Sequence, residues 1–192
     1  MDIKYEEYGF YRIDKDYLKY LNSVDNQVFY KDEPEYDKKP HLGFLVGINN
    51  YMYCIPLTSA KKRHLEWQNV SEHNYLIYEI VNKDELHKDD VYKQISKEPL
   101  KFKKLLSVLE IRKMIPINNS VANKIIFNNI SDENYKNLLL KEYRFLGSYK
   151  RQILEKAQEL YYKQKETGIV KSCYVTFNKV EKAYIEKFKG TN

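Results

Sequence analysis

The stretch LGFLVGINNYMYCIPLTSAKKRH, residues 42–64, decides the fold of this chain. Its two apolar runs, residues 42–48 and 51–57, are separated only by Asn49 and Asn50. Asparagine tolerates the positive φ that a two-residue type I′ turn requires, so apolar runs around an Asn pair are typical of a β-hairpin. The stretch therefore predicts two antiparallel strands, with a polar and basic segment directly after the second.

Patterns on either side of this hairpin predict further elements. Residues 8–13 are typical of a short strand, and Asp14 can cap a helix that ends near Asp25. Residues 82–104 are charged and nearly free of helical periodicity, which indicates a surface excursion that could include a short helix. The apolar side of the first helix comprises Tyr17, Leu18, Leu21 and Val24. Apolar segments that can join the sheet lie at residues 76–81, 105–111 and 114–117.

The C-terminal third has a helical pattern. Ser131 can cap one helix, and Gly147 separates it from a second helix that ends at Gly168. Residues 173–177 alternate as a short strand, and Asn178 can cap a final helix. The core stripe of the second helix comprises Ile153, Ala157, Leu160 and Tyr161. The chain is therefore predicted to be α+β, with a helical C-terminal third.

Composition favours a polyanionic partner. The chain of 192 residues fits one domain, residues 1–192, and its 33 Lys and Arg against 27 Asp and Glu give a net charge of +6. Its 19 tyrosines could stack on unpaired bases, which favours single-stranded RNA over a duplex. The alternative is an AT-rich coding genome, which would enrich lysine and tyrosine without any selection for binding.

Other classes of protein are not expected. The apolar runs are too short to cross a bilayer, and the acidic start lacks the features of a signal peptide, so we expect a cytoplasmic protein. Cys54 and Cys173 are interpreted as reduced core thiols. No histidine has ligand spacing with another metal-binding residue, and no glycine-rich phosphate loop is present. We therefore expect neither a metal nor a cofactor.

The segment after the second hairpin strand carries candidate chemistry. Thr58 and Ser59 could donate hydrogen bonds to phosphate oxygens, and Lys61 could stabilise the negative charge of a phosphorane transition state. Lys62 and His64 extend this basic run and are candidates for contact with RNA. The alternative is a solvated polar turn in which a hydroxyl caps the next element.

A second candidate group, Tyr36, Lys38 and Lys39, precedes the hairpin. A phenol can stack on a base, and a lysine near Lys61 would lower the pKa of Lys61 and favour proton exchange near neutral pH. The hairpin could bring this group close to Ser59. The alternative is a lysine-rich surface loop.

Four segments, taken in order, resemble the ToxN/AbiQ family of endoribonucleases, the toxins of type III toxin–antitoxin and phage-abortive systems. The resemblance covers most of the first 120 residues. It is carried by FYRIDKDYLKYL, EYDKKPHLGFLVGI, YCIPLTSAKK and LEIRKMIPI. The order of the four segments is more specific than any one of them.

This resemblance implies roles for particular residues. Thr58, Ser59 and Lys61 match the reaction site of the family. The residues that would line the site are Tyr36, Lys39 and Tyr17. Two departures stand out: Ala60 replaces a proline, and the interval before Gly43 is one residue shorter, which leaves Lys38 and Lys39 interchangeable.

The resemblance also implies a fold, a partner and a reaction. The fold would be a twisted antiparallel sheet, a partial barrel related to the Kid and MazF toxins, decorated by helices. A cognate repeat RNA folded as a pseudoknot would inhibit the toxin in a ring-shaped toxin–RNA assembly, and the toxin would trim those repeats. Cellular or phage mRNA would be its substrate, cleaved without metal to a 2′,3′-cyclic phosphate and a 5′-OH.

Two other function classes use the same residues. A noncatalytic RNA-binding module would place the lysines and tyrosines on phosphates and bases and yield no product. Only the basic charge supports the hypothesis of a DNA-binding regulator, because no convincing helix-turn-helix pattern is present.

Overall fold

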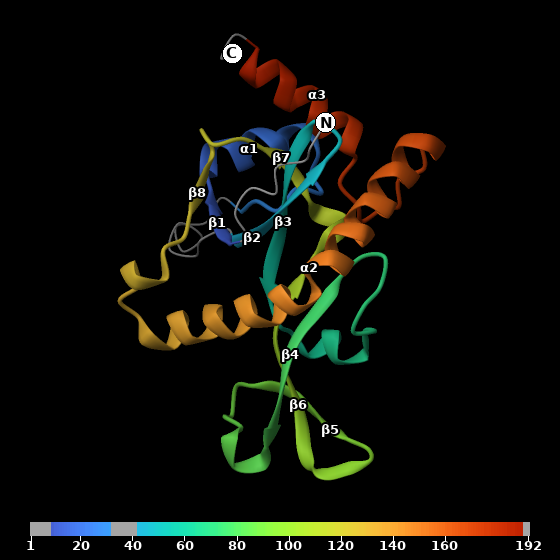
Figure 1. Ribbon diagram of the computed structural model, residues 1–192. Helices are drawn as coiled ribbons and strands as arrows, with labels where there is room; N and C mark the ends of the chain where they lie inside the picture. The colour runs from blue at the N-terminus through green and yellow to red at the C-terminus, as the bar shows by residue number, and fades with distance from the viewer. Residues whose placement is uncertain (1–8, 32–41, 190–192) are drawn as a thin grey trace.

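The computed structural model describes residues 9–31 and 42–189 and has the predicted α+β architecture (Figure 1). The strands are β1 (Phe10–Ile13), β2 (Leu42–Ile48), β3 (Tyr51–Ser59), β4 (Tyr75–Asn82), β5 (Val91–Ile95), β6 (Glu98–Leu109), β7 (Ile115–Ile117) and β8 (Ala122–Lys124). The helices are α1 (Lys15–Val24), α2 (Glu133–Thr167) and α3 (Phe177–Phe188). The strands form one curled antiparallel sheet in the order β4-β6-β3-β2-β1-β8, with β5 added beside β6 and β7 beside β3.

The β2–β3 hairpin confirms the prediction from the Asn pair. Ile48 pairs with Tyr51 across the turn, and Asn49 has a positive φ of 55°. Strand β3 runs beyond Leu57 to Ser59 and changes partner along its length, pairing with β7 near its start and with β6 near its end. The hairpin therefore connects the two halves of the sheet.

Helix α1 begins where its cap was predicted. The Asp14 carboxylate accepts a hydrogen bond from the Tyr17 backbone N–H at 2.8 Å, and Asp25 is the C-cap. Tyr17, Leu18 and Leu21 are buried as expected. Val24 was expected on the same side but is exposed.

The charged stretch 82–104 lies on the surface, as predicted, and includes the short 3-10 helix Lys83–Glu85, although its strands were not predicted. Its larger part forms β5 and the first half of β6, a hairpin that projects away from the body of the protein (Figure 1). Tyr92 and Phe102 pack edge to face across it, with ring centroids 5.7 Å apart. Because water reaches both faces of this hairpin, its residues carry no alternating apolar pattern.

Helix α2 is continuous through Gly147, so the predicted break there was wrong. Its cap is Asp132 rather than Ser131, and it ends at Gly168 as predicted, with a φ of 67°. Gly147 and Ser148 lie near the middle of the helix, where Figure 1 shows a change in its direction. The Ser148 hydroxyl donates a hydrogen bond to the Arg144 carbonyl, and such bonds often bend helices. The glycine therefore accompanies a bend and not an end.

The predicted strand at residues 173–177 is also absent; a turn leads into α3, which begins at Phe177 with Thr176 as its cap. The Thr176 backbone N–H donates to the Asp25 carboxylate at 2.8 Å. Cys54 is a buried free thiol as expected, whereas Cys173 is exposed. The apolar residues that alternate in the stretch 173–177 therefore lie in a turn and at the start of α3, where Val175 and Phe177 are buried.

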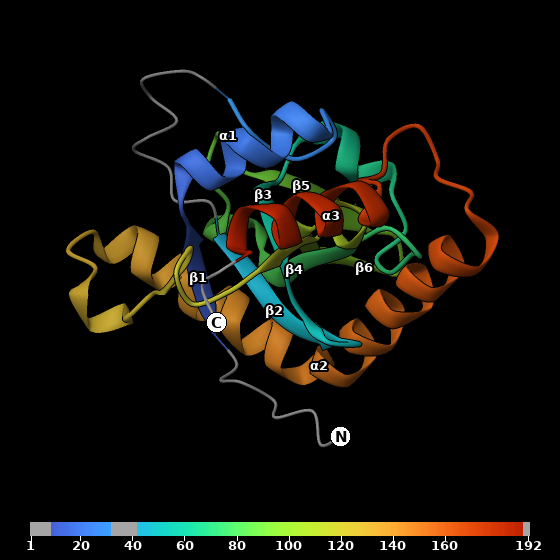
Figure 2. The same ribbon diagram turned by 90° about the horizontal axis from the view of Figure 1, so that it is seen from above.

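The main core lies between the sheet and the helices. Contacts place α2 against β2 and β4, while α3 lies between α1 and β7. Figure 2 shows α1 and α2 on opposite sides of β2, with α3 over the centre. All four residues of the predicted α2 stripe, Ile153, Ala157, Leu160 and Tyr161, are buried. None of the helices in the described part of the chain is both long and apolar enough to cross a bilayer.

We predict that Gly43→Ala lowers the free energy of unfolding by about 1–3 kcal/mol, the usual cost of overpacking. Gly43 lies opposite Pro56 in the β2–β3 ladder, and a Cβ atom there would overlap Cys54 Sγ and come within 3.0 Å of the Ile55 carbonyl oxygen. Urea denaturation checks the prediction.

The matched control is a double-mutant cycle with Cys54→Ala, which removes the obstructing sulfur. The double variant should lose less stability than the sum of the two single variants. Strict additivity would show that the sulfur is not what Gly43 avoids.

Candidate active site

The candidate segment 58–64 begins on an ordered strand. Ser59 lies directly opposite Ser107 of β6, and Thr58 lies opposite Val108. Directly opposed residues of an antiparallel pair share a face, so Ser59 and Ser107 point to one side of the sheet and Thr58 to the other. Ser59 is exposed. The structure thus presents the Ser59 hydroxyl to solvent at the end of β3.

The Thr58 hydroxyl is a buried polar group without a hydrogen-bond partner among the residues that the structure describes. A buried hydroxyl that forms no hydrogen bond costs free energy. Such groups are rare in folded proteins and are found where a ligand or a conformational change completes the bonding. Thr58 is therefore a donor available for a ligand that reaches it.

His64 fixes the turn that follows β3. Its Nδ1 accepts a hydrogen bond from the Lys61 backbone N–H at 3.1 Å, and its own backbone N–H donates to the Lys61 carbonyl at 2.8 Å. Burial, aided by the Arg63 guanidinium and the Lys61 ammonium, lowers the pKa of His64. Its side chain is only 1% exposed, which corrects the expectation that it contacts RNA. It instead positions the backbone of Lys61.

A small second core supports this turn from beneath. Leu76, Leu105 and Val108 form it, and Ala60, Leu65 and Trp67 pack against it. The Trp67 ring lies 4.6 Å from the His64 ring, centroid to centroid. The Lys93 ammonium of β5 donates to the Leu65 carbonyl at 2.7 Å. The β5–β6 hairpin that the sequence did not predict therefore holds the turn in place.

Lys61 and Lys62 are exposed. Neither ammonium group has an ion-pair partner in the described ranges, 9–31 and 42–189. An unpaired cation beside an exposed hydroxyl is available to an anionic ligand such as a phosphate. The segment as a whole offers Ser59, Lys61 and Lys62 on the surface.

Tyr17 does not line the site. Its side chain is fully buried, and its hydroxyl donates to the Pro116 carbonyl at 2.6 Å. Burial raises its pKa far above the ordinary value of a phenol. The expectation of RNA contact through Tyr17 is therefore corrected: this residue fixes α1 to β7.

Tyr36, Lys38 and Lys39 lie outside the described residues. The part of the loop that precedes them, residues 26–31, is anchored by Lys113, whose ammonium donates to both the backbone carbonyl and the side-chain amide oxygen of Gln27 at 2.9 and 2.8 Å. Burial lowers the pKa of Lys113. Lys113 belongs to the segment LEIRKMIPI, so this segment holds the start of the loop in place.

Glu142 is a functional candidate that sequence reasoning missed. It extends from α2 toward Ser107, the residue opposite Ser59, and is only 3% exposed. Burial raises its pKa to about 7, although the Ser107 hydroxyl beside it opposes this shift. A glutamate on an otherwise apolar helix side was the only sequence signal, and it is too weak to be recognised without knowing which side is buried.

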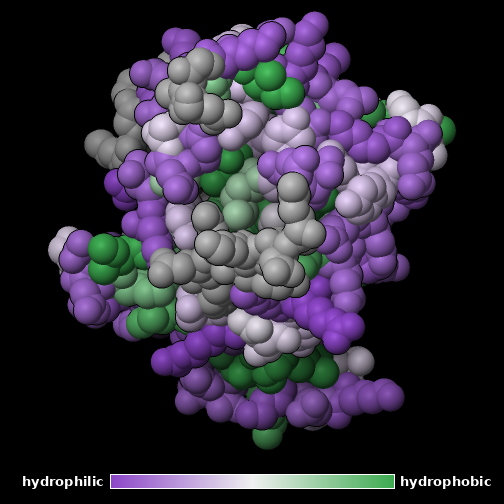
Figure 3. Space-filling view, turned by 45° about the horizontal axis from the view of Figure 1, so that its top comes forward, coloured by the Kyte–Doolittle hydropathy of each residue, from purple (hydrophilic) through white to green (hydrophobic). Residues whose placement is uncertain are grey.

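The face in Figure 3 is mostly hydrophilic, with small hydrophobic patches. Across the portion of the chain with described coordinates, no group of three or more His, Cys, Asp or Glu side chains could hold a metal ion. The candidate site therefore consists of hydroxyl groups and cations.

Sequence comparisons connect this chain to known proteins. The sequence model of a family described as the toxin ToxN of type III toxin–antitoxin systems matches residues 9–185. The chain is 27% identical over 152 residues to the endoribonuclease ToxN of Pectobacterium atrosepticum, covering 79% of this chain and 78% of that protein. It is 27% identical over 155 residues to the endoribonuclease ToxN of Bacillus thuringiensis subsp. kurstaki, covering 79% of this chain and 66% of that protein.

Solved structures share the fold. A structure from work on selective toxin inhibition by a non-coding RNA pseudoknot matches with a TM-score of 0.70 at 20% identity, covering 96% of this chain and 99% of that chain. A structure from work on a bacterial antiviral system regulated by a processed non-coding RNA matches with a TM-score of 0.67 at 22% identity. The match covers 93% of this chain and 98% of that chain. AbiQ, a lactococcal anti-phage endoribonuclease of a type III toxin–antitoxin system, matches with a TM-score of 0.61 at 18% identity. The match covers 94% of this chain and 98% of that chain.

We predict that Glu142→Gln removes a loss of stability that the wild type shows between pH 4.5 and pH 8. The pKa of Glu142 is about 7 in the folded protein against an ordinary value of 4.5. Below pH 4.5 the carboxyl is therefore protonated in both the folded and the unfolded protein, and its burial costs no ionisation free energy. As the pH rises through this window, the unfolded state releases its proton first and stability falls, by up to about 3 kcal/mol. Urea denaturation at the two pH values measures the difference.

The exposed Glu66→Gln is the matched control and should keep the wild-type pH dependence. Identical pH profiles for Glu142→Gln and wild type would refute the proposed burial of this carboxyl.

Proposed function

The chain belongs to the ToxN family of toxins from type III toxin–antitoxin systems, and we propose that it is an endoribonuclease that cuts RNA without a metal ion. One observation carries this proposal: the exposed Ser59 ends an ordered strand, two residues before Lys61, whose ammonium has no ion-pair partner among the described residues. The matching relatives are endoribonucleases, and the net charge of +6 favours a polyanionic substrate.

The proposed reaction is a transesterification within RNA. The ribose 2′ oxygen transfers its proton to solvent and bonds to the adjacent phosphorus, and the bond from phosphorus to the 5′ oxygen breaks as that oxygen takes up a proton from Lys61. The products are a 2′,3′-cyclic phosphate and a 5′-OH. DNA lacks the attacking hydroxyl, which makes the reaction selective for RNA.

The residues have separate roles in this reaction. Ser59 donates a hydrogen bond to a nonbridging phosphate oxygen. The buried Thr58 hydroxyl points to the other side of the sheet, so Thr58 joins this contact only after the end of β3 rearranges. Lys61 stabilises the phosphorane and protonates the leaving 5′ oxygen. Tyr36, with Lys39 or Lys38, orients the strand for in-line attack, and Lys62 contacts a neighbouring phosphate.

A non-coding RNA is the proposed inhibitor. One of the similar solved structures comes from work on a toxin that a non-coding RNA pseudoknot inhibits. We extend this to a cognate repeat pseudoknot that the toxin itself processes and with which it closes into a cyclic assembly. The substrate would be cellular or phage mRNA in the cytoplasm, and the outcome would be abortive infection.

We predict that Lys61→Ala lowers the rate of RNA cleavage by about 10²–10³, the usual cost of removing one group that stabilises transition-state charge. Lys62→Ala is the matched control because it removes an adjacent exposed, unpaired ammonium. It should weaken RNA binding and leave the turnover rate close to that of the wild type. Undiminished cleavage by Lys61→Ala would reject the assignment.

We also predict that purified protein leaves cyclic-phosphate ends on RNA in the presence of EDTA. The attacking group is the substrate's own 2′-OH, so no metal-bound water is needed. Mapping the chemistry of both new ends checks this. Binding without product would favour the noncatalytic RNA-binding module, and complete loss of cleavage in EDTA would contradict the metal-free reaction.

A further inference from the structure

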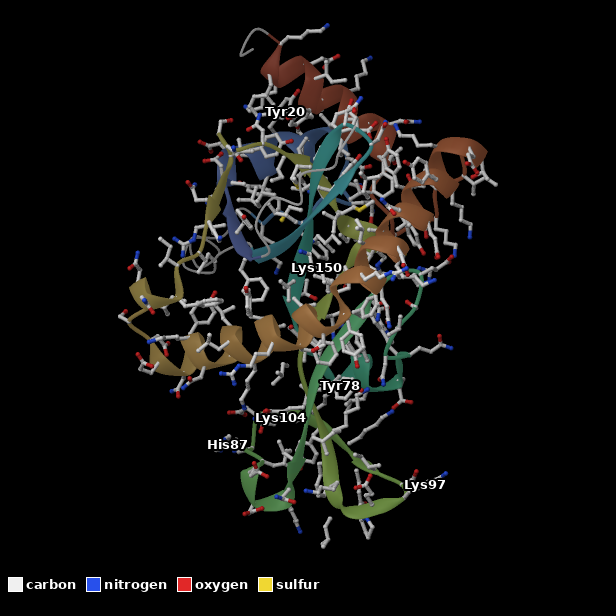
Figure 4. The ribbon with its side chains drawn as sticks, viewed as in Figure 1. Tyr20, Tyr78, His87, Lys97, Lys104 and Lys150 are labelled. Atoms are coloured by element: carbon white, nitrogen blue, oxygen red, sulfur yellow. The ribbon has the colours of Figure 1, made fainter. Side chains whose placement is uncertain are left out.

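A cavity of about 690 Å³ opens beside Ser59. It lies between the first turns of α2, the adjoining parts of β4 and β6, and the segment that leads into β5. Figure 4 shows Lys104 and His87 near each other below the first half of α2. Because Ser59 lines this cavity, any ligand that fills it adjoins the candidate phosphate position.

One side of the cavity is a polar stripe of α2. Asn134, Asn137 and Lys141 line it, each about one helical turn from the next. Both asparagines are exposed. Neither side-chain amide makes a hydrogen bond to any of the described residues. The stripe thus offers two amides, each able to donate and accept, in a cavity next to Ser59.

Both lysines of the cavity are already paired with carboxylates. Lys104 forms an ion pair with Asp90 at 2.8 Å, and Lys141 forms one with Glu79 at 2.7 Å. Asp89 adds a further carboxylate to the lining. A phosphate would meet cations that are already paired and would be repelled by the carboxylates. The cavity therefore suits an uncharged ligand.

Apart from Ser59 and His87, the remaining lining is apolar. Val91, Leu105 and Leu138 contribute to it. A nucleobase has flat faces that favour apolar contact and an edge of donors and acceptors that asparagine can read. Carboxylates such as Glu79 can accept a hydrogen bond from an exocyclic amino group. The cavity volume lies within the range of about 300–1,000 Å³ that is usual for small-ligand sites.

We propose that this cavity binds the base of a nucleotide next to the scissile phosphate, and that Asn134 and Asn137 determine which base is accepted. The inference rests on the proposed function of Ser59 and Lys61. The phosphate lies at the exposed end of β3, where the exposed Lys61 attracts it. The adjoining base enters the cavity, where both lysines are already paired.

The test is the base preference of cleavage. Wild type, Asn134→Ala and Asn137→Ala are incubated with a randomised RNA pool, and the new ends are sequenced. Each variant should relax the preference at one position beside the cut by about tenfold, within the discrimination that a bidentate contact provides. Asn128→Ala, at an exposed asparagine outside the cavity, is the matched control and should keep the wild-type preference.

A binding measurement separates this inference from the proposed function. Four oligoribonucleotides that differ only in the base beside the cut carry a 2′-deoxy sugar at the cleavage position. The wild type should prefer one base, and Asn137→Ala should lose that preference. If wild type binds selectively but never cuts RNA, the nuclease proposal fails and the subsite stands. If both asparagine variants keep the wild-type preference in cutting and binding, or if wild type binds no RNA, the subsite is refuted.

Discussion

The pairing of β3 with β6 is the interaction on which the rest of the site depends. It extends β3 beyond its hairpin and places Ser59 opposite Ser107 on an ordered strand. Val108 and Leu109, the neighbouring residues of β6, are fully buried, so this register cannot slip without exposing them. Helix α2 packs above the same strands and carries Glu142 and the polar stripe of the cavity. One short ladder therefore sets the positions of the hydroxyl, the buried carboxyl and the cavity wall.

The turn after β3 is rigid for a separate reason. His64 occupies a buried position in which its ring accepts the Lys61 N–H, and Trp67 covers that ring. Lys93 reaches from the β5–β6 hairpin to fix the Leu65 carbonyl. Groups held by packing and by buried hydrogen bonds lose little entropy when they bind a ligand. Lys61 is thus held at its backbone while its ammonium stays exposed for substrate.

Sequence alone predicted those features whose signal is local. The turn at Asn49 and the cap at Asp14 follow from backbone preferences that neighbouring residues do not override. The predicted helix break at Gly147 was wrong because one glycine destabilises a helix by only about 1 kcal/mol. Burial of other residues of the helix offsets this cost. The β5–β6 hairpin lacks the alternation of a half-buried strand because water reaches both its faces. The roles of His64 and Glu142 depend on residues far away in sequence, and no local pattern reports such contacts.

The central claim is that the scissile phosphate of RNA lies at the end of β3. The most direct measurement is a crystal structure of the protein with an oligoribonucleotide that carries a 2′-deoxy sugar at the cleavage position. We expect a phosphate within hydrogen-bonding distance of Ser59 Oγ, with the Lys61 ammonium beside it. A phosphate backbone that passes over another face of the protein and leaves Ser59 and Lys61 in solvent would show that RNA is not cut at the end of β3.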